Sequence, residues 1–401
     1  MKPKAIVFNC SYNGLSIIQE LSKSGVECIA MDCFRGIGTY SRYASRFVKC
    51  ADPRYHEEKF IEQLYNLCIR EEHKPVLFPT NDEWALAVAR NKKKLEAVAH
   101  VCVSDISSVD VILNKDQFYQ IGYENTFMTP RTWPYNELKN IRSADFPIVA
   151  KAKYKSVPDG KSIGLDSELE KNRLIVIDNM QQLEAYIREN NHLLDYLVFQ
   201  EYVRGDSGQM YTVGIYADDE SKIKALFTGR KVRGYPAHYG DNIVGESCTV
   251  PAELIDNARK IVRFLNYTGI AEFEYKKDEV TGDFKLIEIN PRSWSWIGIT
   301  PHCGVNIPLI AYLNMSGIDK NITHLTQSAE RVRYVKVLQD LTNCLFRYRK
   351  SYPKWAMSYK QWKKDMSSSK NVYAEFYMKD IPVSIISFFY LMAKIIKQRA
   401  D

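Results

Sequence analysis

The sequence lacks the patterns that mark several common classes of protein. Its nine cysteines are irregularly spaced and include no Cys-x-x-Cys pair, which argues against a disulfide framework and against a zinc site. The seven histidines form no pair at metal-binding spacing, either with each other or with cysteine. The longest late apolar stretch, residues 381–393, is shorter than the ~20 residues that span a bilayer. No secretory leader is expected, so these absences favour a cytoplasmic protein with reduced thiols.

Two short motifs resemble nucleotide-binding loops but are incomplete. The segment 159–162 matches the end of a P-loop, but Lys155 stands where the leading glycine is required. Gly36 and Gly38 lack the third glycine of the dinucleotide fingerprint, and they follow the second expected strand instead of the first. The sequence therefore predicts neither a P-loop nor a dinucleotide site.

The chain does have enough apolar material for several cores. It contains 401 residues, of which 45% are hydrophobic and 26% are charged, and this favours two or three globular domains. Lys and Arg number 55 against 48 Asp and Glu, so the formal net charge is +7. This excess is mild for the size of the chain and does not predict nucleic acid as a partner.

The first 113 residues alternate between strand-like and helix-like patterns. Apolar runs at 5–8, 26–31 and 75–79 predict strands, and the spacing of apolar residues predicts helices before residue 25 and over 56–70. These lengths indicate right-handed βαβ units and a parallel sheet. Ligands bind outside the carboxyl ends of such strands. At these ends lie residues 11–14, Asp32 and residues 80–83.

The pattern changes after about residue 114. Residues 210–217 and 222–231 predict one pair of strands, and residues 271–277 and 284–290 predict a hairpin. A third segment begins near residue 319. Between residues 331 and 370 it contains eleven Lys or Arg but only two Asp, interleaved with Trp and Tyr.

The hairpin carries the strongest chemical signal. The two-residue period of a strand places Glu272 and Glu274 on one face, and Glu288 and Asn290 on one face of its partner. If the strands pair, carboxylates and an amide oxygen converge into a site suited to Mg²⁺. Arg292 follows two residues after Asn290, where its guanidinium could bind a phosphate or a carboxylate. The alternative is a solvent-exposed hairpin with ordinary acidic alternation.

At these residues the sequence resembles the ATP-grasp superfamily. The resemblance covers about residues 1–318 and follows the order of the chain. It is carried by Asn114-Lys115, Thr129-Pro130, Pro147 to Lys151, Phe199 to Val203, Gly269 to Glu274 and Glu288 to Arg292.

The resemblance implies a fold, a cofactor and residue roles. The fold would be α/β and α+β: a Rossmann-like pre-ATP-grasp domain (1–113), a two-subdomain ATP-grasp domain (114–318, small subdomain at about 125–200) and a basic, helical C-terminal region (319–401). The chain would bind ATP with Mg²⁺, or with Mn²⁺ as the alternative metal. The implied metal ligands are Glu274, Glu288 and Asn290. The implied nucleotide-binding residues are Lys115, Lys151, Gly160, Lys161, Ser162, Gln200, Glu201, Tyr202 and Val203.

The basic run between residues 229 and 236 resembles the subset of carbamoyl-phosphate-synthetase-like and D-aspartate-ligase-like members. Lys231 and Arg233 of this run join Arg292 as the candidate catalytic residues, and the alternative for the run is a solvated surface. Two features depart from the family pattern. Asn114 replaces the commoner aspartate, and the loop 154–164 has only two glycines.

The implied function is an ATP-dependent ligase that activates a carboxylate as an acyl phosphate and joins it to an amine, forming a carbon–nitrogen bond. The alternatives are a carboxylase or kinase-like enzyme acting on bicarbonate or another metabolite, and a non-catalytic, membrane-docked protein that binds Mg·ATP. The expected partners are a small-molecule carboxylate and an amine, without nucleic acid; a homodimer is a further option. Residues 331–401 are expected either to pack on the protein or to contact an anionic membrane at its inner face.

Overall fold

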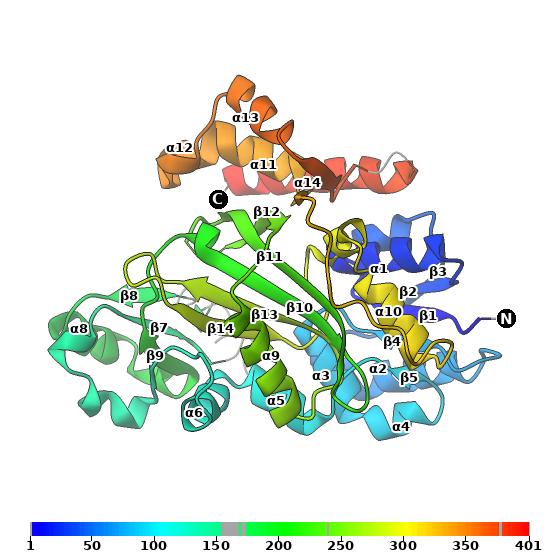
Figure 1. The fold of residues 1–401 in the computed structure, drawn as a ribbon, viewed down its shortest axis with the longest axis horizontal. Coiled ribbons are helices and arrows are strands. Elements are labelled where there is room, and N and C mark those ends of the chain that lie inside the picture. The colour runs from blue at the N-terminus through cyan, green and yellow to red at the C-terminus, as the bar shows by residue number, and fades with distance from the viewer. Residues whose placement is uncertain (1, 154–167, 170–173, 239, 377–378, 401) are drawn as a thin grey trace.

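The computed structural model describes residues 2–153, 168–169, 174–238, 240–376 and 379–400, and Figure 1 shows how they are arranged. They form three sheets that follow one another along the chain. The candidate phosphate-binding residues Gly160, Lys161 and Ser162 lie outside the described residues.

The first sheet is parallel, as the alternating pattern predicted. Its order is β3-β2-β1-β4-β5, and every neighbouring pair is parallel. The strands are β1 (Ala5–Phe8), β2 (Cys28–Asp32), β3 (Ala44–Lys49), β4 (Val76–Phe78) and β5 (His100–Val101). The helices of this domain are α1 (Tyr12–Lys23), α2 (Pro53–Cys68), α3 (Asp82–Arg90), α4 (Lys92–Glu96) and α5 (Ile106–Leu113). The sequence pattern missed β3 and β5, because β3 has a polar, half-exposed sequence and β5 has two residues.

The second sheet is small and antiparallel. It contains β6 (Thr132–Trp133), β9 (Leu197–Glu201), β7 (Ile148–Ala152) and β8 (Ile175–Ile177), in that order. Helix α6 (Lys115–Glu124) leads into it, and α8 (Met180–Glu189) packs on it through its one buried residue, Leu183. In Figure 1 this sheet lies to one side of the large sheet, opposite the parallel domain.

The third sheet is the largest, with the order β14-β13-β10-β11-β12-β15-β16. Its first five members are β10 (Met210–Ala217), β11 (Ile223–Tyr235), β12 (Asp241–Ser247), β13 (Gly269–Lys277) and β14 (Phe284–Asn290). Both predicted strand pairs are confirmed, because β10 pairs with β11 and β13 pairs with β14. Helix α9 (Ala252–Phe264) packs on one face of this sheet.

The opposite face packs against the parallel domain through one shared core. That core contains Trp294 and Trp296, residues of α1 and residues of α10 (Ile307–Met315). Glycines of the large sheet make room for the indoles, since a Cβ on Gly214 would lie 2.3 Å from the Trp294 ring. The shared core fixes the carboxyl ends of the parallel strands against the large sheet.

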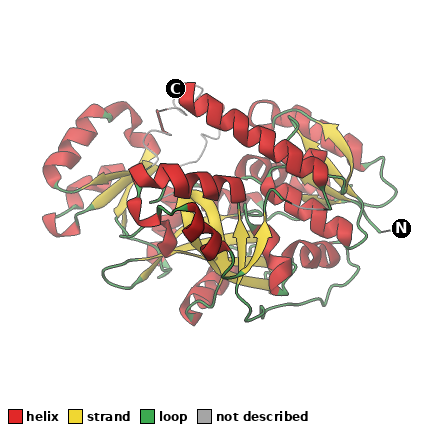
Figure 2. Cartoon of the chain, turned by 90° about the horizontal axis from the view of Figure 1, so that it is seen from above, coloured by secondary structure: helices red, strands yellow, loops and turns green. Residues whose placement is uncertain are grey.

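The C-terminal segment also joins the large sheet, which the sequence pattern did not predict. Strands β15 (Val332–Val335) and β16 (Lys370–Tyr373) extend that sheet beyond β12. The boundary expected at residue 318 therefore separates two segments of different composition, but strands from both segments belong to the same sheet. The helices of this segment are α11 (Val337–Thr342), α12 (Tyr348–Ser351), α13 (Tyr359–Met366) and α14 (Ile381–Ala400). Figure 2, seen from above, shows α14 lying across the top of the molecule.

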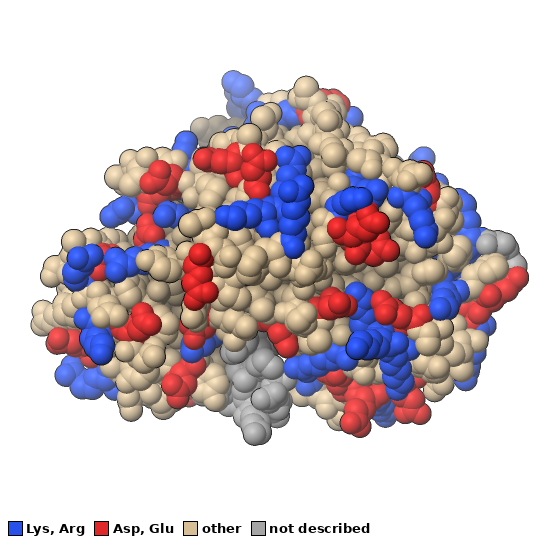
Figure 3. Space-filling model, turned by 60° about the horizontal axis from the view of Figure 1, so that its bottom comes forward, with Lys and Arg blue, Asp and Glu red and all other residues tan. Residues whose placement is uncertain are grey.

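Helix α14 begins on the parallel domain. Val383 packs against Leu15 and Ile37, and Asp380 accepts hydrogen bonds from Ser41 Oγ and the Arg42 backbone N–H. In the part of the chain that the structure describes, no helix combines the length and apolar character needed to cross a bilayer. On the face shown in Figure 3, basic and acidic side chains are interspersed, so the net positive charge is not concentrated there.

Candidate active site

The candidate site is built on the β13–β14 hairpin. In the observed register Glu274 lies opposite Glu288, and Glu272 lies opposite Asn290. Residues that are directly opposite in an antiparallel pair share one face of the sheet. The hairpin therefore brings the four polar side chains together, as the two-residue period predicted.

Lysines balance the two candidate metal-binding carboxylates. Lys231 Nζ lies 2.8 Å from Glu274 Oε1, and Lys115 Nζ lies 3.6 Å from Glu288 Oε1. Burial alone would lower the pKa of Lys231, but the Glu274 carboxylate outweighs burial and raises it. Lys231 is therefore held as a cation beside the Glu274 carboxylate.

The donor set is compatible with a magnesium ion. Glu274, Glu288 and Asn290 offer hard oxygen atoms, and Mg²⁺ typically takes one or two carboxylates and completes its shell with water and phosphate oxygens. Among the described residues no group of three or more His, Cys, Asp or Glu forms a metal site made by the protein alone. Two carboxylates and an amide fit an ion that arrives together with a nucleotide better than they fit a permanent structural metal.

Lys151 is the most buried cation of the site. Its Nζ donates to Tyr119 OH at 2.9 Å and lies 4.7 Å from the centre of the Tyr119 ring. Burial, followed by the charge of Lys115, lowers the pKa of Lys151 well below its ordinary value. Keeping a charge on a buried ammonium is costly, so the position favours the arrival of an anion such as a phosphate.

Arg292 connects the hairpin to the parallel domain. Its Nε lies 2.9 Å from Asp82 Oδ1, and its Nη2 donates to Asn290 Oδ1 at 3.0 Å. Asp82 begins α3, and three residues separate it from the carboxyl end of β4. In the same region Asn13 Nδ2 donates to the carbonyl oxygens of Thr80 and Ser293. The strand ends singled out from the sequence thus meet the hairpin.

Glu272 lies beneath this cluster. It accepts hydrogen bonds from Thr212 Oγ1 at 3.1 Å and from Asn290 Nδ2 at 2.9 Å. Burial, and then the charge of Glu274, raises the pKa of Glu272 to about 8. The Asn290 amide donates to Glu272 and accepts from Arg292. These two contacts together fix the orientation of the amide.

The candidate adenine-binding residues lie at the end of β9 and in the loop that follows it. Gln200 is buried, and its Nε2 donates to Thr132 Oγ1 at 2.8 Å. The Glu201 carboxylate accepts from the Arg131 backbone N–H and lies 3.7 Å from Lys285 Nζ. Lys276 Nζ lies 5.5 Å from the centre of the Tyr202 ring, and Val203 is buried. These residues line the junction between the small sheet and the large sheet.

The basic residues of β11 do not all face the candidate site. This corrects the expectation that Arg233 is a catalytic residue together with Lys231. Lys231 joins the site, but Arg233 does not: its guanidinium is buried against Asp340 and Asp365 of the C-terminal segment, with three contacts of 2.8–3.0 Å. The pairing of β11 with β12 shifts between Lys231 and Arg233. This bulge at residue 232 breaks the two-residue alternation that would otherwise place both side chains on one face.

Sequence reasoning missed Tyr119, Thr212 and the pairing of Asp82 with Arg292. Tyr119 lies four residues after Lys115 on α6, so helical spacing could have placed both on one side of that helix. Thr212 lies opposite Glu274 on the neighbouring strand β10, and only the strand order reveals this. Asp82 and Arg292 are 210 residues apart, and no local pattern links them.

A family model described as "ATP-grasp in the biosynthetic pathway with Ter operon" matches residues 198–338. A D-aspartate ligase of Enterococcus faecium (strain Aus0004) is 22% identical over 235 residues, which cover 55% of this chain and 53% of that protein. The chain thus spans about half the length of this curated relative.

Two solved structures are similar in fold. The N5-carboxyaminoimidazole synthetase of Staphylococcus aureus, complexed with ADP, has a TM-score of 0.65 at 14% identity, covering 92% of this chain and 98% of that one. The L-amino acid ligase of Bacillus licheniformis has a TM-score of 0.59 at 14% identity, covering 82% and 79%. The partial family match, the similarity to a D-aspartate ligase and the shared fold all agree with the resemblance of this chain to the ATP-grasp superfamily.

Proposed function

We propose that this chain is an ATP-dependent ligase that activates a carboxylate as an acyl phosphate and joins it to an amine. The observation that carries the proposal is the convergence of Lys115, Lys231 and Arg292 on the acidic hairpin, at the carboxyl edge of the parallel sheet. The similarity to a D-aspartate ligase and to the fold of an L-amino acid ligase supports the same class of reaction.

The chemistry requires positioning and charge neutralisation. A carboxylate is a poor electrophile, and transfer of the γ-phosphoryl group turns one of its oxygens into a leaving group. Lys151 and Lys115 are placed to offset phosphate charge, and Lys151 gains most, because its Nζ is buried and its hydrogen bond goes to the uncharged Tyr119 hydroxyl. Mg²⁺ bound by Glu274, Glu288 and Asn290 would offset the charge of the phosphate oxygens and align them.

Arg292 is the residue best placed to hold the substrate carboxylate. It is anchored by Asp82 from the parallel domain and by Asn290 from the hairpin, so its guanidinium is fixed relative to both. A fixed guanidinium orients a carboxylate for in-line attack on the γ-phosphorus. The acid therefore binds between the strand ends of the parallel domain and the hairpin.

The test is the release of ADP from Mg·ATP with a panel of amino acids, hydroxy acids and bicarbonate, supplied singly and in pairs. D-aspartate is the first acid to try, because the curated relative is named for it. Turnover should require one acid together with one amine. Glu288→Gln should reduce turnover by about 100-fold or more, and Glu253→Gln, an exposed glutamate in the first turn of α9, serves as the matched control.

Two outcomes would redirect the proposal. Bicarbonate-dependent ADP release without an amine would indicate a carboxylase. Calorimetry that detects no binding of Mg·ATP would refute the nucleotide-dependent function altogether.

Contact of the C-terminal segment with an anionic membrane is a separate proposal, favoured by exposed apolar side chains on α14. Ile385, Phe388 and Phe389 are 51%, 45% and 63% exposed. A truncation would remove β15 and β16 from the large sheet, so point variants are the better test. Replacing Phe388 and Phe389 by serine should abolish co-sedimentation with anionic vesicles. Equal pelleting of both proteins would reject membrane contact, and a loss of dimers in the variant would assign the face to self-association.

A further inference from the structure

A pocket of about 530 Å³ lies on the face of the large sheet opposite the hairpin carboxylates. Its lining includes Tyr211, Arg230, Glu246, Thr249, Gln327 and Arg331. Arg230 and Glu246 face each other across the β11–β12 pair, and Arg230 also faces Tyr211 across the β10–β11 pair. Lys231, the next residue along β11, contacts Glu274 on the other face, so the sheet separates this pocket from the candidate active site.

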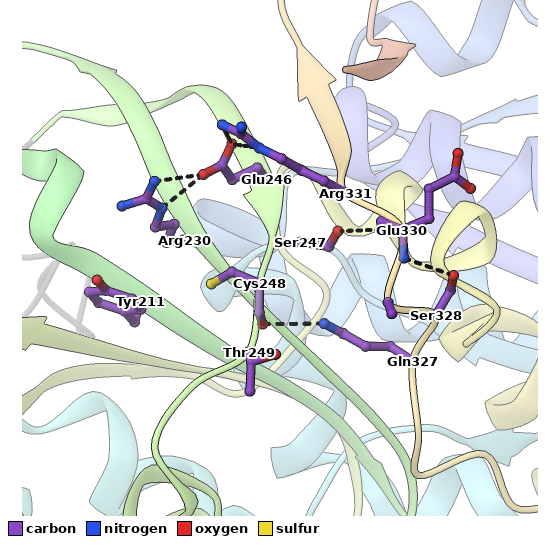
Figure 4. A pocket seen from close by; sticks show the side chains of 11 residues that line it. Tyr211, Arg230, Glu246, Ser247, Cys248, Thr249, Gln327, Ser328, Glu330 and Arg331 are labelled. Carbon is purple, nitrogen blue, oxygen red and sulfur yellow. Dashed lines mark hydrogen bonds and ion pairs between the residues drawn. The ribbon is translucent and has the colours of Figure 1, made fainter. Parts of the chain in front are cut away.

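One carboxylate in this pocket holds three guanidinium groups. Glu246 Oε1 accepts from Arg230, and Glu246 Oε2 accepts from Arg331 and Arg333 (Figure 4 shows the first two). Arg333 also contacts the Asp365 carboxylate, so Arg230 and Arg331 share the single charge of Glu246 and leave an excess of one positive charge at this end of the pocket. Burial alone would raise the pKa of Glu246, but the hydrogen bonds from Arg331 and Arg230 outweigh burial and lower it.

Two of the three guanidiniums are accessible to a ligand. The side chain of Arg230 is 40% exposed and that of Arg331 is 50% exposed, whereas the Glu246 side chain is 3% exposed. Arg333 is buried, and its Nη1 contacts Asp365 instead of the pocket. A ligand in the pocket would therefore meet the edges of two guanidiniums, with the compensating carboxylate beneath them.

The walls of the pocket are held in place without a ligand. Gln327 Nε2 donates to the carbonyl oxygens of Thr228 and Cys248, and Gln327 Oε1 accepts from the Thr228 backbone N–H. Ser247 Oγ donates to the Glu330 carbonyl oxygen. These bonds tie residues 327–331 to β11 and β12. The two arginines are thus presented by a preformed groove, which lowers the entropic cost of binding.

We propose that this pocket binds a small molecule carrying a carboxylate or phosphate group, held by the guanidiniums of Arg230 and Arg331. Charge-assisted, two-pronged hydrogen bonds from arginine suit both groups. Tyr211 and Thr249, at the other end of the pocket in Figure 4, would contact the remainder of the ligand. The site goes beyond the proposed ligase function, because no residue of it belongs to the nucleotide- or metal-binding set.

The experiment measures binding of inorganic phosphate and of succinate to the full chain by calorimetry, with a non-hydrolysable ATP analogue and Mg²⁺ present to fill the nucleotide site. Saturable binding of at least one probe is expected. Arg331→Gln and Arg230→Gln should each weaken it about tenfold, because each removes one charge-assisted contact. Arg263→Gln, an exposed arginine near the end of α9 outside the pocket, is the matched control and should bind as the unmodified protein does.

Three results would overturn the proposal. Absence of saturable binding of both probes, or equal affinity in all four proteins, would show that the pocket does not bind small anions. An equal loss in the Arg263 variant would show that binding follows overall charge only. If the pocket variants lose binding of phosphate alone, the ligand belongs to the phosphate class. If they lose binding of succinate alone, it belongs to the carboxylate class. Both results support the site.

Discussion

The removal of Arg233 provides a decisive test of whether this residue is structural or catalytic. Its Nε and Nη2 each donate to Asp340 at 2.8 Å, and its Nη1 donates to Asp365 at 3.0 Å. The Asp340 side chain is fully buried. Arg233→Ala would leave this carboxylate with the indole N–H of Trp362, which donates at 2.9 Å, but without its guanidinium partner. We expect a loss of about 3–5 kcal/mol in the free energy of unfolding, the usual result of breaking a buried ion pair from one side.

The assay is urea denaturation followed by tryptophan fluorescence, with two controls. Replacing both partners, by Arg233→Met with Asp340→Leu, should recover most of the loss, because no buried charge then remains without a partner. The unpaired Trp362 N–H would keep a residual cost of about 1–2 kcal/mol. Arg90→Ala breaks a partly exposed pair with Glu57 and should cost less than about 1 kcal/mol.

Two results would refute this reasoning. One is a loss below about 1 kcal/mol in Arg233→Ala, and the other is an equal loss in the single and double variants. ADP release decides the catalytic question. If the double variant is stable and turns over, Arg233 is structural; if it is stable and inactive, Arg233 acts in the reaction after all.

Three further predictions concern single residues. Lys151→Met should weaken Mg·ATP binding at least about tenfold while leaving stability unchanged or higher, because a buried ammonium is costly without an anion; calorimetry and urea denaturation measure the two effects. Gly214→Ala should destabilise the protein by about 1–3 kcal/mol, because its Cβ would meet the Trp294 ring at 2.3 Å; an unchanged urea midpoint would contradict this. Burial raises the pKa of Glu375 to about 7, from 4.5, so the folded state binds an extra proton between these values and loses stability as pH rises through them. Glu375→Gln should therefore be more stable than the unmodified protein at pH 8, by up to about 3 kcal/mol, and the difference should vanish towards pH 4; a constant difference across this range would reject the assignment.

The sequence predicted the parts of the site that depend on local order. The hairpin has a six-residue connection between its strands, so its pairing and the face shared by Glu274 and Glu288 followed from the two-residue period. The strand ends near Asn13 and Asp82 were singled out because parallel sheets bind ligands at that edge. Both arguments need only neighbours along the chain.

Other features depend on contacts between distant segments, and no local pattern contains them. Strands β15 and β16 are four residues each; β15 pairs with the edge of β12, and β16 pairs in turn with β15. In a segment rich in Lys, Trp and Tyr, helix is the more natural prediction, and it was correct for α11 and α13. The acidic partners of the segment, Asp340 and Asp365, face inward to Arg233, while its lysines at 360, 363 and 364 remain exposed.

The basic run of β11 shows why a charge pattern alone does not assign a role. Arg230, Lys231 and Arg233 are near neighbours in sequence, yet each has its own carboxylate: Glu246 from β12, Glu274 from β13 and Asp340 from α11. Strand alternation separates the first two, and the bulge at residue 232 separates the last two. If each partner determines the role, three variants of one strand should fail in three different assays. Arg230→Gln should lose anion binding, Lys231→Met should lose ADP release, and Arg233→Ala should lose stability. Failure of all three in the same assay would mean that the run acts as one charged surface and that its partners do not define it.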